Sequence, residues 1–209
     1  MGRGSGGGSR GGGKSGGGGG SGEEWTQAEK DAITTYTTRE YASINSGLRS
    51  GHLSEKDQDT VDKLDSALGK KKLKKKAVLY ENQQLYRAAA VPEINAALKN
   101  KKNIEGLVYT DKAFVSTTRE KSAAHNFQRS KDSRIFVIHA PKGTRAADVS
   151  GLSSFGKGES ETLLARNTKF KVRKVERVRE RYKTTDLKGR AVTRTRTQEY
   201  IHVDVIGQG

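Results

Sequence analysis

The sequence predicts an α+β fold in which helices come first and a largely antiparallel β assembly follows. Up to Gly69, apolar residues recur at helical spacing behind capping residues. After the lysine-rich segment 70–76, short stretches rich in β-branched and aromatic residues take over. Near the end of the chain, Ile201, Val203 and Val205 alternate with polar residues, as on a half-buried strand.

Residues 1–22 are expected to form a disordered tail or linker, because 14 of them are glycine and little surface can be buried to offset chain entropy. The segment also has the Arg-Gly-Gly character of RNA-binding tails, but it contains no aromatic residue on which a base could stack. A linker is therefore the favoured interpretation. The remaining residues, 23–209, are long enough for one domain and too short for two comfortable ones.

The chain is strongly basic, with 40 Lys and Arg residues against 24 acidic ones and a formal net charge of +16. Such a charge favours an anionic partner: a nucleic acid, an acidic protein or a phosphate-bearing small molecule. Disulfides and thiolate zinc sites are excluded because there is no cysteine, and the four histidines show no ligand spacing, so no metal site is expected. No apolar stretch approaches the roughly 20 residues that span a bilayer, and the start lacks the core of a signal peptide, so a soluble protein is expected.

Three helices are predicted in the amino-terminal third. The first begins at Thr26, which forms with Glu29 the Thr-x-x-Glu pattern of a capping box. The second is short and ends near Gly51. The third is signalled by Ser54 as its cap and Gly69 as its end.

Seven strands are predicted in the rest of the chain. They span residues 84–89, 107–110, 113–117, 134–140, 162–166, 168–178 and 193–205. Helices are expected after Pro92 and from 119 to about 128, and residues 186–190 have the composition of the turn in a long basic hairpin.

Two glutamates one residue apart, Glu159 and Glu161, follow a glycine-rich stretch and precede an apolar pair. In a strand that begins near Glu161, alternate side chains share a face, so both carboxylates could point into one cleft. Such a pair suits acid–base chemistry or the stabilisation of a developing cation. Taken alone, it is better explained by two solvated acids at the edge of a loop.

Three hydroxyl residues, Ser116, Thr117 and Thr118, end an apolar strand directly before a helical stretch. They either cap that helix or position a neighbouring carboxylate by hydrogen bonding. Upstream, Arg87 lies in a strand that looks buried. Its planar guanidinium suits a bidentate grip on a diphosphate, although a surface salt bridge explains a single arginine equally well.

Along the chain, these features come in the order arginine, Ser-Thr-Thr and Glu-x-Glu. In this order the sequence resembles the mono-ADP-ribosyltransferases of the Arg-Ser-Glu class, which include the enzyme components of clostridial binary toxins and their phage and bacterial relatives. The resemblance covers about residues 26–175. It includes the helical segment 32–49, the motif at 113–118, and segments 140–144 and 161–164. It implies an ADP-ribosyltransferase-like α+β fold, with amino-terminal helices on a mostly antiparallel two-sheet β core.

The resemblance also implies a role for each matching residue. Glu161 would stabilise the ribose cation that forms as nicotinamide leaves NAD, and Ser116 would orient that carboxylate by a hydrogen bond. The residues implied to bind NAD are Arg87, Ser116, Thr118, Phe127, Arg129, Tyr36, Tyr41 and Asn45. Among these, Arg87 and Arg129 would hold phosphates, and Phe127 would stack on nicotinamide. Plain core packing is the alternative for Phe127 and the tyrosines.

Glu159 would act on the acceptor, because a glutamate at this position accompanies arginine acceptors in the resembling enzymes, and a carboxylate can bind a guanidinium and take its proton. Phe155 would lie in a mobile turn, residues 151–158, that recognises the acceptor. One departure concerns the diphosphate: many relatives have a basic residue or glycine after the motif arginine, and this chain has Ala88.

We therefore expect an NAD-dependent mono-ADP-ribosyltransferase that modifies a protein, with arginine as the acceptor residue. The reaction is expected to need no metal. It would be a toxin, an effector or a phage enzyme acting in the cytoplasm of a target or host cell. Two alternatives stay open. One is a basic nucleic-acid-binding protein that uses segments 70–76 and 171–196; the other is an NAD glycohydrolase, in which water is the acceptor at the same site.

Overall fold

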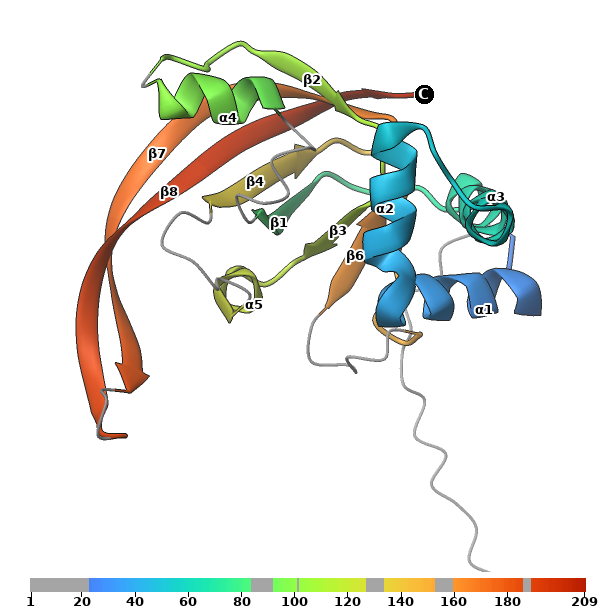
Figure 1. Cartoon of the computed structure of the whole chain (residues 1–209), viewed down its shortest axis with the longest axis horizontal. Coiled ribbons are helices and arrows are strands. Elements are labelled where there is room, and N and C mark those ends of the chain that lie inside the picture. Colours follow the sequence, from blue (N-terminus) through green and yellow to red (C-terminus); the bar gives the residue numbers. More distant parts are fainter. Residues whose placement is uncertain (1–22, 84–91, 101, 127–133, 153–159, 186–188) are drawn as a thin grey trace, which may run out of the picture.

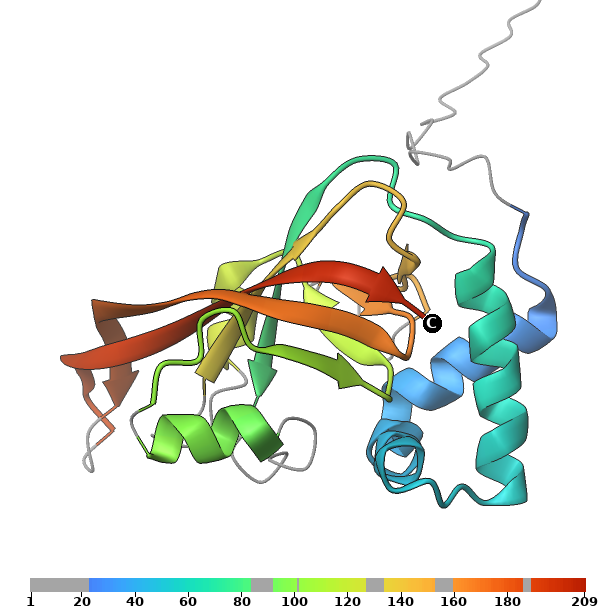
Figure 2. The same cartoon turned by 90° about the horizontal axis from the view of Figure 1, so that it is seen from above.

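The structure, a computed structural model, describes residues 23–83, 92–100, 102–126, 134–152, 160–185 and 189–209. It has the predicted α+β class: three helices gather at one end of a long, bent β sheet (Figure 1). Figure 2 shows the same helices from above, packed against the end of the sheet that is opposite a protruding pair of strands. None of the described helices is long and apolar enough to cross a membrane.

The three amino-terminal helices begin and end where the capping residues predicted. Helix α1 (Gln27–Thr35) starts at a complete capping box, in which Thr26 and Glu29 each accept a hydrogen bond from the other's backbone amide. Helix α2 (Tyr41–Ser50) ends at Gly51, whose φ of 80° is the left-handed conformation that glycine adopts without strain. Helix α3 (Glu55–Gly69) is capped by the side chain of Ser54.

A π-helical turn, η1 (Tyr36–Glu40), joins α1 to α2, and nothing in the sequence analysis anticipated it. The hydroxyls of Thr34, Thr37 and Thr38 each donate to a carbonyl of the preceding turn. Such bonds compete with the regular helical ladder and bend a helix. The two helices accordingly meet at a sharp angle (Figure 1).

The described strands form one sheet of eight. Its members are β1 (Ala77–Gln83), β2 (Val108–Asp111), β3 (Val115–Thr118), β4 (Arg134–Ala140), β5 (Ala146–Asp148), β6 (Glu161–Leu164), β7 (Thr168–Thr185) and β8 (Ala191–Gln208). They are ordered β2-β7-β8-β4-β1-β3-β6-β5, and every pair is antiparallel except β4 with β8. Two helices interrupt the strands, α4 (Pro92–Lys99) and α5 (Lys121–Asn126), near the predicted positions.

Six of the seven predicted strands are present, and the seventh, predicted at 84–89, lies outside the described residues. Strand β1, directly before that segment, was not predicted. The three-residue strand β5 was not predicted, because it is too short to show an alternating pattern. Strands β7 and β8 continue well beyond the predicted ends and form the predicted long hairpin.

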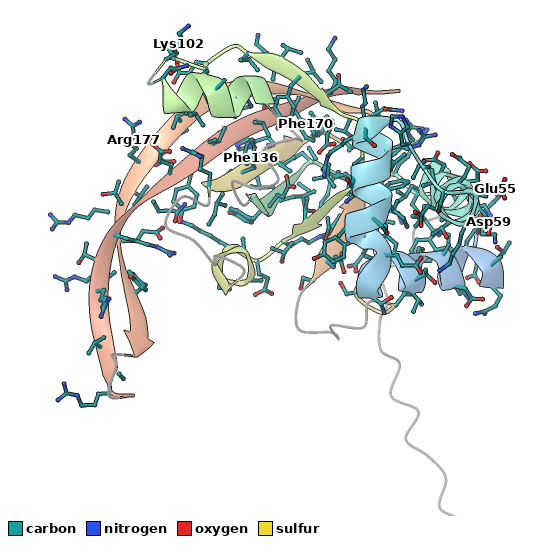
Figure 3. All side chains as sticks on the ribbon, in the orientation of Figure 1. Glu55, Asp59, Lys102, Phe136, Phe170 and Arg177 are labelled. Carbon is teal, nitrogen blue, oxygen red and sulfur yellow. The ribbon has the colours of Figure 1, made fainter. Side chains whose placement is uncertain are left out.

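The two-sheet description needs a correction, because a register pair between Tyr80 of β1 and Thr118 of β3 joins the two halves into one sheet. The sheet instead bends over its own core. Val115 and Leu164 from one half are buried in the same cluster as Phe136 and Phe170 from the other. Figure 3 labels these two phenylalanines inside the curve of the sheet.

A second core cluster fixes the helices to the short strands. Tyr36 and Leu64 from the helical layer are buried with Phe114, just before β3, and Leu163 of β6. Successive residues of β6 thus serve different clusters, since Leu163 faces the helices and Leu164 faces the interior of the bent sheet. This strand pair therefore connects both halves of the core.

Part of the lysine-rich segment 70–76 is structural rather than solvated. The Lys70 ammonium lies 2.9 Å from the carboxylate of buried Glu29. The Lys71 ammonium lies 5.4 Å from the centre of the Trp25 ring and donates a hydrogen bond to the Glu23 carbonyl. These two lysines hold Glu23, Trp25 and the first turn of α1 against the end of α3.

Candidate active site

The ladder between β3 and β6 places three predicted site residues on one face. Thr118 is the register partner of Glu161, and Ser116 is the partner of Leu163. Partners across an antiparallel ladder, and residues two apart on one strand, share a face. Ser116, Thr118 and Glu161 therefore lie on the side of β3 and β6 that faces the helices, with Leu163 packed beneath them.

Ser116 and Glu161 are in direct contact. The Ser116 hydroxyl donates a hydrogen bond of 2.6 Å to Oε1 of Glu161, whose side chain belongs to a residue only 9% exposed. A bond of this length to a carboxylate is a strong, charge-assisted one. The contact that the sequence predicted between these two side chains is present, and it fixes the direction of a largely buried carboxylate.

The backbone around Glu161 is also held firmly. Its carbonyl accepts from the amide of Val149 at 3.0 Å and from the hydroxyl of Ser150 at 3.4 Å. The residue before it, Ser160, has a φ of 44°, which is a costly conformation for a residue other than glycine. The chain therefore turns sharply where it enters β6.

The turn at Ser160 bears on the prediction that the side chains of Glu159 and Glu161 share a face. The prediction placed Glu159 and Glu161 on one face by strand alternation, but β6 starts at Glu161 and Ser160 is not extended. Alternation cannot be carried back across a left-handed residue. Glu159 itself lies outside the described residues, so its predicted role is untested.

The other two hydroxyls make different contacts from that of Ser116. Thr118 accepts a hydrogen bond of 3.0 Å from the amide of Glu120, which supports the turn into α5. Thr117 points to the opposite face and donates to the carbonyl of Thr162 at 2.5 Å. Thr118 therefore stabilises the turn before α5 rather than the helix itself, and the carboxylate-positioning interpretation fits Ser116.

Tyr36, Asn45 and the chain just before β3 form a buried polar group next to this pair. The Asn45 amide donates to the Tyr36 hydroxyl at 2.9 Å, and that hydroxyl lies 3.4 Å from the Phe114 carbonyl. The ring of Tyr36, whose residue is 1% exposed, packs edge-on against Phe114 at 5.6 Å. Phe114 is two residues from Ser116, so this group lies close to the Ser116–Glu161 contact.

Asn45 also has a buried acceptor that is unused within the described part of the chain. Its Oδ1 has no hydrogen-bond partner there, although the residue is only 6% exposed. An orphaned buried acceptor costs about 1–3 kcal/mol, a cost that is recovered when a donor arrives. Tyr41, the third predicted residue from this layer, is half-buried against the same apolar cluster.

The remaining predicted site residues are Arg87, Phe127, Arg129 and Phe155, which with Glu159 lie outside the described residues. The described residues contain no group of three or more side chains that could hold a metal ion.

A buried ion pair that the sequence analysis did not identify ties α2 to the sheet. Arg49 donates from Nε at 3.1 Å and from Nη2 at 2.9 Å to the two oxygens of Asp111, which is 2% exposed. The amide of Ala113 donates to the same carboxylate at 2.9 Å. The pair joins positions 62 residues apart, so no local pattern could reveal it. It anchors the helix that carries Asn45.

Glu29 has a second role beyond its capping box. Its carboxylate also accepts hydrogen bonds from Ser66 at 2.6 Å and from Lys70, both at the end of α3. Burial alone would raise the pKa of this group, but the bonds from Lys70, Ser66 and the Thr26 amide outweigh it and lower the pKa from 4.5 to about 2. Glu29 therefore locks α1 to α3 as an ionised group.

Sequence comparisons point in one direction. The profile of the ADP-ribosyltransferase exoenzyme family matches residues 20–203. The NAD(+)--arginine ADP-ribosyltransferase EFV of Enterococcus faecalis is 32% identical over 158 residues, which are 72% of this chain and 29% of that protein. The chain thus spans less than a third of the length of this curated relative.

Solved structures agree on the fold. Plx2a, an ADP-ribosyltransferase toxin from Paenibacillus larvae, aligns with a TM-score of 0.66 at 22% identity over 87% of each chain. The enzymatic component C2-I of the C2-toxin from Clostridium botulinum gives 0.63 at 19% identity, over 87% of this chain and 44% of that chain. Exoenzyme S from Pseudomonas aeruginosa, solved with human 14-3-3 protein beta and carba-NAD, gives 0.59 at 19% identity, over 87% of this chain and 74% of that chain.

Proposed function

The chain belongs to the ADP-ribosyltransferase exoenzyme family, and we propose that it transfers ADP-ribose from NAD to an arginine of an acceptor protein, releasing nicotinamide. The observation that carries this proposal is the 2.6 Å hydrogen bond between Ser116 and the buried carboxylate of Glu161. The curated relative is named for arginine, and the solved structure of exoenzyme S holds carba-NAD; both support the choice of acceptor and donor.

The chemistry needs a fixed negative charge beside the ribose. When the bond between the ribose C1′ and the nicotinamide nitrogen breaks, its electron pair leaves with nicotinamide and the ribose becomes cationic. Glu161 would stabilise that cation, because a preorganised charge in a water-poor site costs no reorganisation as the reaction proceeds. Ser116 would keep the carboxylate pointed at the sugar.

The second half of the reaction forms the new bond. A guanidino nitrogen of the acceptor attacks C1′ and loses a proton, which needs a base near the ribose. We assign this to Glu159, two residues before Glu161, and we assign acceptor recognition to Phe155. Both assignments rest on the family resemblance.

NAD itself would be held from two sides. On the described side, the free Oδ1 of Asn45 offers an acceptor to a hydroxyl or amide donor of the cofactor, with Tyr36 and Tyr41 beside it. On the other side we assign the diphosphate to Arg87 and Arg129 and the nicotinamide ring to Phe127. Thr118 would support the Ser116–Glu161 pair through the adjacent turn.

The biological setting follows from the relatives and is part of the proposal. Several structures with this fold are toxins by name, which supports a toxin or effector that acts in the cytoplasm of a target cell. A phage origin has no support beyond the motif resemblance.

The test compares Glu161→Gln with the unchanged protein and with Glu120→Gln, a matched control on an exposed residue that follows the partner strand β3. Each protein is incubated with radiolabelled NAD and a cell lysate, and both labelled protein and free nicotinamide are measured. We expect Glu161→Gln to lose at least about a hundredfold in labelling rate, as for loss of a main electrostatic stabiliser, while Glu120→Gln keeps the native rate. Equal labelling by all three proteins would refute the proposal.

The same assay separates the glycohydrolase alternative. That activity would release nicotinamide without labelling protein, at a rate that added arginine compounds leave unchanged. Mass spectrometry of the labelled lysate then names the acceptor residue, and modification of a residue other than arginine would overturn the arginine assignment alone.

A further inference from the structure

The ends of β7 and β8 form a two-stranded ribbon that leaves the body of the protein. We define the ribbon as residues 177–185 and 191–199, which pair with one another. Strand β2 pairs with β7 only up to Lys171, and β4 pairs with β8 only from Tyr200 onward. The ribbon therefore extends past both neighbouring strands, as Figure 1 shows.

The two faces of the ribbon differ in burial and in charge balance. One face is half-buried and carries Glu180, Tyr182 and Arg196. Glu180 lies 3.4 Å from Lys121 and 3.9 Å from Arg196, and the Arg196 guanidinium lies over the Tyr182 ring. These residues are engaged in contacts within the protein, whereas Arg194, opposite Tyr182 on the same face, is exposed.

The opposite face, which we call the arginine–threonine face, is exposed along its length. Its members are Arg177, Arg179, Arg181, Thr193, Thr195 and Thr197. The acid at its base, Glu199, is already bonded to Arg134 at 3.0 Å and to Arg177 at 2.9 Å. Within the described part of the chain, neither Arg179 nor Arg181 has a hydrogen bond or ion pair. Figure 3 shows Arg177 pointing outward from the ribbon.

The chemistry of this face suits a polyanion. From Arg179 outward, the described side chains of this face are the guanidinium groups of Arg179 and Arg181, the hydroxyls of Thr193, Thr195 and Thr197, and the methyl group of Ala191, with no acid, aromatic ring or large apolar group among them. Protein interfaces usually bury an apolar or aromatic centre, and single-stranded nucleic acids need stacking rings, so this face fits neither well. Arginine and threonine are among the residues that bind phosphate oxygens in DNA complexes.

The geometry also suits a duplex. Arginines on one face of a strand repeat at about 6.6 Å, so they present a line of forked donors rather than a cluster. A two-stranded ribbon is narrow enough to enter the major groove of B-form DNA, which is about 12 Å wide. From this arrangement we propose that the arginine–threonine face binds the phosphate backbone of double-stranded DNA. This surface is separate from the Ser116–Glu161 pair, and the proposal does not depend on the transferase activity.

Arginines on an exposed ribbon have another use, which is to prevent its free edges from pairing with other chains. That role needs charge but no DNA affinity. A test must therefore separate DNA binding from solubility and from the general charge of the chain.

The experiment measures fluorescence anisotropy of a labelled mixed-sequence duplex of 20 base pairs with the full chain, over a series of KCl concentrations. The test variant is Arg179→Gln/Arg181→Gln. The matched control is Lys102→Gln/Lys142→Gln, which removes the same charge from two exposed lysines away from the ribbon. Size-exclusion chromatography and thermal unfolding check that each protein is folded and monodisperse. Arg179→Lys/Arg181→Lys serves as a charge-conserving variant in case the glutamine variant aggregates.

We expect the ribbon variant to bind the duplex at least about tenfold more weakly at 0.1 M KCl, with a salt slope smaller by about 1.8, as for two lost phosphate contacts. The lysine control should keep the native slope, the charge-conserving variant should keep most of it, and NAD-dependent modification of a small guanidino acceptor should be unchanged in all of them. Equal weakening in the ribbon and lysine variants would overturn the proposal. Failure of the native chain to bind the duplex would also overturn it, as would equally tight binding of a single strand. If the ribbon variant loses binding to polyglutamate but still binds the duplex, the face recognises an acidic protein and the proposal is wrong.

Discussion

Replacing Ser116 by alanine removes the contact on which the proposed mechanism depends most directly. The substitution deletes one hydroxyl that donates at 2.6 Å to Glu161 and leaves the carboxylate in place. Ser116 is exposed and lies on the side of β3 away from the bent-sheet core. The change should therefore affect the direction of Glu161 far more than the packing of the strand.

The size of the effect follows from the type of bond. Hydrogen bonds to charged groups contribute about 1.5–3 kcal/mol, which corresponds to about 10- to 150-fold in rate if the bond acts fully in the transition state. Because the lost interaction concerns a charge that develops during the reaction, the fall should lie mainly in kcat rather than in KM. The free energy of unfolding should change by less than about 1 kcal/mol, as is usual for an exposed position.

The assay measures initial rates of nicotinamide release with a small guanidino acceptor such as agmatine, together with thermal unfolding. Ser43→Ala is the control, since Ser43 is an exposed residue of α2 whose hydroxyl bonds, among the described contacts, only to the carbonyl of Glu40 in the preceding turn. Ser116→Thr keeps a hydroxyl and should recover part of the rate. The reasoning fails if Ser116→Ala stays within about twofold of the native kcat, or if its rate falls only in proportion to a fall in folded protein.

Three further predictions concern stability. Glu29→Gln should lower the free energy of unfolding by about 3 kcal/mol at neutral pH, because the fold lowers the pKa of Glu29 to about 2. This contribution is complete above pH 4.5 and fades as the pH falls toward 2, so the difference in unfolding free energy between the two proteins, measured in urea, should narrow in acid. A difference that stays constant with pH would contradict the prediction. Gly47→Ala places a Cβ 2.9 Å from the His52 carbonyl and should cost about 1–3 kcal/mol, whereas Gly69→Ala, which meets nothing within 4 Å, should be neutral or stabilising in the same thermal assay. Arg49→Ala leaves the Asp111 carboxylate buried without its ion pair and should lower the free energy of unfolding by about 3–5 kcal/mol. Adding Asp111→Asn to that variant should recover part of the loss. If the effects of the two substitutions simply add, the two residues are not energetically coupled.

The predictable part of the fold is the part that short-range chemistry decides. Helices α1 and α3 begin beside Thr26 and Ser54, whose side chains accept hydrogen bonds from amides of the first turn. Helix α2 ends at Gly51, which adopts the left-handed conformation. The link between Tyr80 and Thr118, and the parallel pairing of β4 with β8, depend on segments far apart in the chain. No periodicity in one segment specifies its partner, so these pairings could not be derived from the sequence.

The site shows the same division. The order of Ser116 and Glu161 in the sequence predicted their contact through a family pattern, and the register of β3 against β6 places them together. The sequence did not reveal that Ser160 is left-handed, so strand alternation does not place Glu159 relative to Glu161, and their pairing stays a prediction. It also did not reveal that Asn45 Oδ1 has no partner among the described residues, because the hydrogen bond of Asn45 with Tyr36 depends on how η1 and α2 meet in space.

The position of the site on β3 and β6 explains how an exposed hydroxyl and a nearly buried carboxylate can hold a fixed geometry. Val115 and Leu164 alternate with Ser116 and Leu163 along the same two strands, so the face opposite the Ser116–Glu161 pair is buried in the core of the bent sheet. A rotation of either strand would have to break that core packing, and the contacts of Val149 and Ser150 with the Glu161 carbonyl add to the preorganisation of the pair. The bidentate contact of Arg49 with Asp111 extends the same constraint to the helix that carries Asn45.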